Sequence, residues 1–254
     1  MYALKALTHR NLKAMGSGYK DAIINSLAMA LLWSINGKYL LPAVGLNPAI
    51  AGPMFIGSLI FTFFEVTFNR GIAFVFDVHG PRTLNFYMTL PYGIIYFLLA
   101  HMISLSLEII ALSLPALILG KIILGSLLTI QASAIPSFIL VYVLSTFFFA
   151  GLTLAISLSS SISWFLHSNF AQCIGPMAFL GCMDVPWTFI STTFPTLRWI
   201  FVISPATYVT EGLRRTLLGH DTFALWLCIG MILFYTALTL AITWYALRKK
   251  YDYI

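Results

Sequence analysis

Residues 194–219 read FPTLRWIFVISPATYVTEGLRRTLLG, and this segment is too interrupted and too polar to be a plain membrane span. Pro195 and Pro205 divide it into apolar pieces shorter than the roughly 20 residues that a membrane-spanning helix needs. Its aromatic rings are of the kind that lie at the depth of lipid headgroups: Trp199, Phe201 and Tyr208. Its charges are costly among lipid tails unless they are paired: Arg198, Glu211, Arg214 and Arg215. We therefore expect two short re-entrant helices within residues 184–219, one beginning near Pro186 and the other after Pro205.

The composition indicates a protein that is almost wholly embedded in a membrane. Of its 254 residues, 60% are hydrophobic and 9% are charged. An ordinary soluble domain carries about 25% charged residues. The three cysteines lie in apolar segments without the spacing of a disulfide framework or a zinc site: Cys173, Cys182 and Cys228. We interpret the formal net charge of +6 as a topology signal and not as a nucleic-acid-binding surface.

The hydrophobic pattern predicts a single all-α polytopic transmembrane domain over residues 1–254. Residues 1–21 carry basic side chains among leucines at helical spacing, which predicts an amphipathic surface helix; a secretory signal is the alternative. Six spans are expected to follow: residues 22–41, 51–68, 92–119, 135–158, 164–183 and 223–247. An even number of spans puts both termini on one side. Placing that side in the cytoplasm gives nine Lys and Arg residues inside against five outside.

A proline, a short aromatic helix, Ser-Pro-x-Thr-Tyr at residues 204–208 and Glu-Gly-x-Arg at residues 211–214 come before the last apolar span. This order resembles the C-terminal signature of type-2 ABC exporter permeases, the membrane subunits of ATP-driven exporters of drugs, glycolipids and polysaccharides. On the motif alone, the alternative is that the Pro and Trp residues mark a membrane-surface loop. The signature residues are Pro195, Pro205, Tyr208, Glu211 and Arg214.

The resemblance implies a homodimeric permease in the inner (cytoplasmic) membrane, surrounded by lipid, with both termini cytoplasmic. It implies two copies of a separate ABC ATPase subunit that bind ATP and Mg²⁺, while this chain holds no cofactor, metal or catalytic group. In the family, a cytoplasmic loop carries a coupling helix that docks on the ATPase, and here it would be residues 69–91. A solvated loop with a surface helix is the alternative. The coupling residues would be Arg70, Phe74, Phe76, Asp77, His79 and Arg82.

The resemblance also assigns roles to the first, second and fifth spans. The first and fifth would form the dimer interface, through small and amide residues that permit close helix contact: Asn25, Ser26, Gln172, Gly175 and Gly181. All three spans would line the substrate path, with Met29, Trp33, Phe55, Phe61, Phe170, Met177, Phe179 and Met183 as the path residues. The alternative for these Phe and Met side chains is that they face lipid.

One polar group lies within the third span. His101, Ser104 and Glu108 share one helical face because they are spaced by three and four residues. A carboxylate at that depth normally faces the bundle interior with a partner. The group is either a proton or substrate site or a hydrogen-bonded cluster between helices. We favour the cluster, because transport in the family is driven by ATP.

A second polar group lies just before the last span. Glu211 is spaced to pair with Arg214 and Arg215 on one helix, which would neutralise charge at the membrane surface. Contact with the headgroup of a substrate is the alternative.

The sequence carries no motif for bond chemistry. It contains no G-x-x-x-x-G-K-[ST] phosphate loop, so ATP hydrolysis by that device would belong to a separate chain. It also contains no H-E-x-x-H zinc motif and no G-x-S-x-G nucleophile elbow. We therefore predict a non-catalytic export permease. An intramembrane enzyme and a nucleotide-independent channel or assembly subunit are the alternatives.

Overall fold

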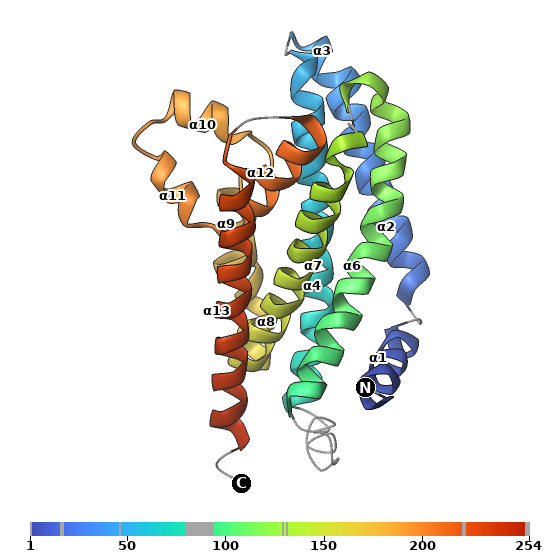
Figure 1. Ribbon diagram of the computed structural model, residues 1–254, viewed down its shortest axis with the longest axis vertical. Helices are drawn as coiled ribbons and strands as arrows, with labels where there is room; N and C mark the ends of the chain where they lie inside the picture. Colours follow the sequence, from blue (N-terminus) through green and yellow to red (C-terminus); the bar gives the residue numbers. More distant parts are fainter. Residues whose placement is uncertain are drawn as a thin grey trace.

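The computed structural model describes residues 2–15, 18–45, 47–79, 94–128, 130, 132–219 and 222–251. All regular secondary structure within these residues is helical (Figure 1). Four helices contain stretches long and apolar enough to cross a membrane: α4 (Ala51–His79), α6 (Ile94–Leu124), α7 (Ile135–Ser159) and α13 (Leu225–Tyr251). The protein is therefore an all-α membrane protein, as the composition predicted.

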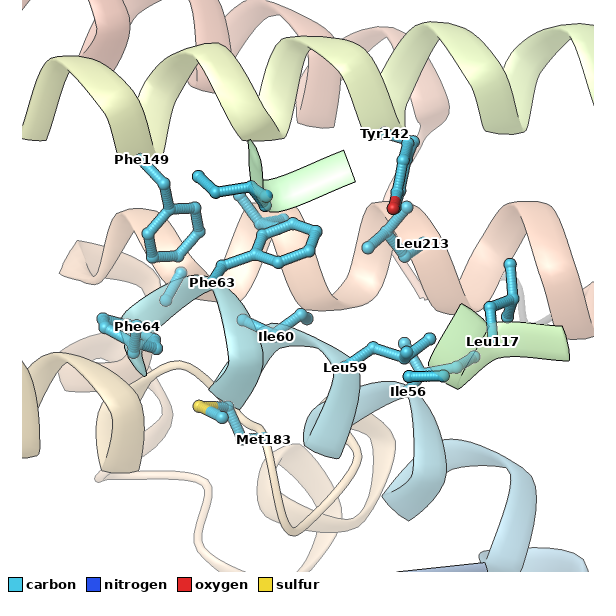
Figure 2. Close-up of a cluster of buried hydrophobic side chains, with 14 of the residues drawn as sticks. Ile56, Leu59, Ile60, Phe63, Phe64, Leu117, Tyr142, Phe149, Met183 and Leu213 are labelled. Carbon is cyan, nitrogen blue, oxygen red and sulfur yellow. The ribbon is translucent and has the colours of Figure 1, made fainter. Parts of the chain in front are cut away.

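The helix α4 lies at the centre of the fold and α13 at its edge. In the most apolar window of α4, 72% of the residues are buried, against 17% in the window of α13. Figure 2 shows the reason, because α4 side chains such as Ile60 and Phe63 pack among residues from α6, α7 and α12. The Phe63 ring meets the rings of Tyr142 and Phe149 edge-on, at centroid distances of 5.8 and 5.4 Å. Such edge-to-face pairs add to the burial energy and fix the spacing of α4 and α7.

The first expected span, residues 22–41, lies in a continuous helical run that contains a π-helical segment. The helix α2 (Tyr19–Ile35) leads into the π-helix η2 (Asn36–Leu40) and then into α3 (Leu41–Ala43). π-Helical turns within helices are frequent at functional sites. The run packs against both α4 and α6.

The fifth expected span, residues 164–183, is not one continuous helix. It consists of α8 (Ile162–His167), the π-helix η6 (Phe170–Ile174) and α9 (Gly175–Leu180). Pro176 has no N–H to continue the hydrogen bonds of the preceding turn, which accounts for the new helix that starts there. The apolar part, Phe170–Leu180, is shorter than the roughly 20 residues that a spanning helix needs.

Three short helices, where we expected two, connect this segment to α13. They are α10 (Trp187–Thr193), α11 (Arg198–Ile203) and α12 (Pro205–Leu218). As expected, a helix begins directly after Pro186 and another at Pro205. The additional helix α11 exposes Trp199 and Ile203, whereas most side chains of α12 are buried. These helices lie toward the same end of the molecule as α3 (Figure 1).

The N-terminal helix α1 (Tyr2–Met15) packs against α6. Leu7 and Asn11 are buried in that contact, while Lys5 and Lys13 are exposed. A helix with basic and apolar residues was expected here, but its apolar face is turned at least partly toward protein. The start of α1 and the end of α13 lie at the same end of the molecule, opposite α3 (Figure 1).

The second expected span, residues 51–68, is too short. The helix α4 continues through residues 69–79, which were assigned to a polar connection carrying a separate short helix. The Arg70 side chain instead forms an ion pair with Glu108 of α6, so its charge is neutralised within the bundle. The third span is also longer than expected, since α6 runs through Pro115 and Lys121 to Leu124.

Candidate functional site

A groove lined by aromatic and apolar side chains lies between α2, α4 and the segment that contains α9. Its volume is about 280 Å³, and we call it the aromatic groove. The residues that line it are Trp33, Gly57, Ser58, Phe61, Ala178, Phe179, Met183 and Asp184. Four of the eight predicted path residues are among them: Trp33, Phe61, Phe179 and Met183. The first, second and fifth expected spans therefore do meet around one hollow.

The other four predicted path residues do not line this groove. Phe55 is fully buried in the hydrophobic core. Its face of α4 points into the bundle, which a single sequence does not distinguish from the groove face. Met29 and Met177 are half-buried, and Phe170 is exposed on η6 with its ring edge-on to that of Phe68 at 6.0 Å.

A second hollow lies between α2, α4 and α6. We call it the polar cavity, and its volume is about 270 Å³. Its walls carry three carboxylates, one guanidinium and two amides: Asp21, Glu65, Glu108, Arg70, Asn25 and Asn69. The remaining lining residues are Gly18, Ala22, Thr62, Val66 and Leu112. No single segment of the sequence indicates this cavity, because its charges come from three helices.

The ion pair between Arg70 and Glu108 forms one wall of the polar cavity. The Arg70 Nε lies 2.8 and 2.9 Å from the two carboxylate oxygens of Glu108, and Nη2 donates to the same carboxylate. Glu108 is 2% exposed. A two-pronged pair of this kind is stronger and more directional than a single hydrogen bond. The expectation that Glu108 faces inward with a partner holds, and the partner is Arg70.

The expected cluster of His101, Ser104 and Glu108 is divided in the structure. The His101 ring faces α1, where its Nδ1 lies 3.3 Å from the Asn11 amide nitrogen. Ser104 donates to the His101 carbonyl of its own helix at 2.9 Å. Neither residue lines the polar cavity. His101 thus links α6 to α1, and only Glu108 belongs to the candidate site.

The guanidinium of Arg214 ties three parts of the chain together. It donates to the Pro53 carbonyl of α4 from Nε at 3.1 Å and from Nη2 at 2.8 Å. It also donates to the Cys182 and Met183 carbonyls, both at 2.6 Å, and to the Glu211 carboxylate at 2.8 Å. Cys182 has a positive φ of 55°, and this conformation accompanies the turn that presents both carbonyls. We call these contacts the Arg214 network.

The Arg214 network corrects the expectation of a surface ion pair. The predicted pairing of Glu211 with Arg214 is present, but the side chains are 0% and 1% exposed. Glu211 also accepts from the Trp187 N–H at 3.1 Å and from the Thr222 hydroxyl at 2.7 Å. Arg215 donates to the Phe223 carbonyl at 2.6 Å. The signature charges therefore hold α12 against α4 next to the aromatic groove, and they hold the start of α10 against α12.

The expected dimer-interface residues do not share one outward face. Ser26 is buried and donates to the Leu112 carbonyl of the same chain at 2.9 Å. Gly181 is buried against α12, since a Cβ there would lie 2.6 Å from the Ala206 Cβ. A leucine at Gly181 would therefore disturb packing within one chain before it could report on a dimer. Asn25 and Gln172 are exposed, and Gly175 is half-buried.

The expected coupling residues divide into an inward and an outward group on the last turns of α4. Phe74 is 8% exposed and packs on Phe97, and Arg70 pairs with Glu108, so both point into the bundle. Phe76 is 45% exposed, and Asp77 and His79 are also exposed. Arg82 lies outside the described residues.

In the part of the chain that the structure describes, no group of three or more His, Cys, Asp or Glu side chains is placed to hold a metal ion. The sequence matches no protein-family model and no curated protein.

Proposed function

We propose that this chain is the permease subunit of an ATP-driven exporter of amphiphilic substrates, working as a homodimer with two copies of a separate ABC ATPase in the inner membrane. The observation that carries this proposal is the aromatic groove. The resemblance to type-2 exporter permeases predicts a substrate path along the first, second and fifth spans, and residues from those three segments line the groove. Aromatic and apolar walls suit the apolar part of a lipid-like, drug-like or glycolipid substrate.

The proposal includes six membrane spans with cytoplasmic termini. The helices α4, α6, α7 and α13 supply four spans, the α2–α3 run supplies another, and the broken segment from α8 to α9 supplies the sixth. The short helices α10, α11 and α12 then lie on the external side as a re-entrant unit. Interrupted helices are tolerated at membrane depth where they are buried in protein or line a cavity, which is the position of α9 beside the groove.

In this mechanism α4 transmits the motion of the ATPase. The exposed Phe76 and Asp77 near its end provide an apolar anchor and a charge that can dock in a groove of the ATPase. From Phe76 to Phe61 is about 22 Å along an uninterrupted helix. A displacement of the docked end would act on the Arg70–Glu108 pair and on the aromatic groove without any bond chemistry in this chain. Substrate would pass the groove and leave by the re-entrant helices.

Replacing Phe76 by aspartate should uncouple transport from ATP hydrolysis. Loss of a central aromatic anchor costs about 2 kcal/mol or more of binding energy, which is roughly thirtyfold in affinity. We expect co-purification with the ATPase and ATP-dependent export to fall together, while insertion and folding stay normal. Asp77→Lys should act in the same way, and Lys249→Asp, a charge reversal near the end of α13, should not. Normal ATPase association and transport in both α4 variants would remove this helix end from the mechanism.

Cysteine labelling should place both termini in the cytoplasm. In a background without Cys173, Cys182 and Cys228, single cysteines at Lys5 and Lys250 should react with a membrane-impermeant maleimide only after the cells are opened. A cysteine at the exposed Thr193 of α10 should react in intact cells. Labelling of both terminal positions in intact cells would contradict the six-span topology.

A further inference from the structure

The polar cavity and the aromatic groove lie along the same seam between α2 and α4. On α4, five of the eight residues that line the two hollows share one helical face through spacings of three and four: Ser58, Phe61, Thr62, Glu65 and Asn69. On α2, residues 21, 22 and 25 face the polar cavity and Trp33, eight residues beyond Asn25, faces the groove. A ligand lying along this seam would contact both hollows.

The distance between the hollows matches a small amphiphile. Phe61 and Glu65 are one turn apart, or about 6 Å along the helix axis. Asn25 and Trp33 are separated by about 12 Å along α2. A polar headgroup in the cavity of about 270 Å³ would therefore leave an attached apolar group within reach of Trp33 and Phe61.

The charges that line the polar cavity determine whether a bound headgroup should be cationic or anionic. The Arg70 guanidinium is matched by the Glu108 carboxylate, so this wall contributes little net charge. The carboxylates of Glu65 and Asp21 remain, and neither forms an ion pair with another residue that the structure describes. Glu65 is partly buried on a membrane-spanning helix, where an unpaired carboxylate is costly. A cationic group in the cavity would offset that cost, whereas an anionic group would increase it.

We infer that the seam binds an amphiphilic cation, with its ammonium or amidinium group between Glu65 and Asp21 and its apolar part against Trp33 and Phe61. Glu65 supplies the ionic contact within the bundle, and Asp21 supplies a second carboxylate near the mouth of the cavity. The side-chain amide oxygens of Asn25 and Asn69 can accept hydrogen bonds from further N–H groups of the ligand. This inference rests on the proposed export function and narrows its substrate class to cations.

The test uses the full chain in phosphatidylcholine nanodiscs and two fluorescent probes of similar size, the cation rhodamine 6G and the anion fluorescein. Fluorescence anisotropy should report binding of rhodamine 6G and not of fluorescein. Glu65→Gln should weaken rhodamine 6G binding by about tenfold, which is about 1.4 kcal/mol. Ser126→Lys, which makes the same change in net charge at an exposed position outside both hollows, should leave that affinity unchanged. Asp21→Asn is a second variant that keeps the test valid if Glu65→Gln does not fold.

Equal affinity for the two probes, or equal rhodamine 6G affinity in the wild type, Glu65→Gln and Asp21→Asn, would overturn the inference. These outcomes are separable from the proposed function, because the binding assay needs neither ATP nor the ATPase. If the ATPase drives export of a neutral or anionic substrate and Glu65→Gln does not impair it, the cation site is wrong and the export function stands. If rhodamine 6G binding depends on Glu65 but no ATPase associates, the site stands and the export function is wrong.

Discussion

Replacing Arg214 by methionine is expected to destabilise the protein by about 3–5 kcal/mol, the cost of leaving a buried charge without its partner. The substitution keeps an unbranched apolar side chain but removes every donor. The Glu211 carboxylate, which is fully buried, would lose its cationic partner. The carbonyls of Pro53, Cys182 and Met183 would lose their guanidinium donors at the same time.

The measurement is thermal unfolding of the detergent-solubilised protein, followed by fluorescence-detected size-exclusion chromatography. Arg248→Met is the matched control, because Arg248 is exposed near the end of α13, with its guanidinium over the Trp244 ring. A surface change of this kind usually stays within about 0.5 kcal/mol. The double variant Glu211→Gln with Arg214→Met should recover part of the loss, since no unpaired charge remains buried. Equal melting temperatures of Arg214→Met and Arg248→Met would show that the Arg214 network does not hold α12 in place.

Replacing Gly57 by alanine is expected to disrupt the aromatic groove. A Cβ at Gly57 would lie 2.0 Å from the Met183 carbonyl oxygen and 2.6 Å from the carbonyl carbon, so backbone would have to move. Overpacking of this kind costs about 1–3 kcal/mol and occasionally more. The segment that would have to move carries Met183 and Asp184, which line the groove, and the Met183 carbonyl also accepts from Arg214. We therefore expect both a lower melting temperature and lower transport.

Gly230→Ala is the control for this substitution, because Gly230 also lies in a membrane-spanning helix and a Cβ there would meet nothing within 4 Å. Thermal unfolding and export should match the wild type in Gly230→Ala and fall in Gly57→Ala. Wild-type behaviour of Gly57→Ala would mean that α4 and the Met183 segment are farther apart in the working protein than in this structure.

Local patterns predicted the features that depend on only a few neighbouring residues. Composition predicted an all-α membrane protein, and the fixed φ of proline predicted that a helix begins at Pro205. The spacing of Glu211 and Arg214 predicted their ion pair. Of the eight residues that the resemblance assigned to a substrate path, four line the aromatic groove: Trp33, Phe61, Phe179 and Met183.

Local patterns were misleading where a residue is matched by a partner far away in the chain. Arg70 was placed in the polar connection 69–91, yet it lies within α4, where Glu108, 38 residues later, neutralises it. Phe55 was assigned to the path with Phe61, although its face of α4 is fully buried. Gly181 was expected to contact a second copy of the chain because glycine permits close helix packing. In the structure, a Cβ at Gly181 would meet the Ala206 side chain of the same chain.

The sequence alone determined that this protein is a bundle of apolar helices with breaks near Pro186 and Pro205, because hydrophobicity and the chemistry of proline act over short distances. Only the tertiary structure decided where the charges lie. It buries Arg214 among carbonyls from two distant segments, pairs Arg70 with Glu108, and leaves Glu65 and Asp21 facing a cavity between α2, α4 and α6. Ion pairs and cavities arise from residues that only packing brings together, and no period or motif in the chain encodes which helix faces meet.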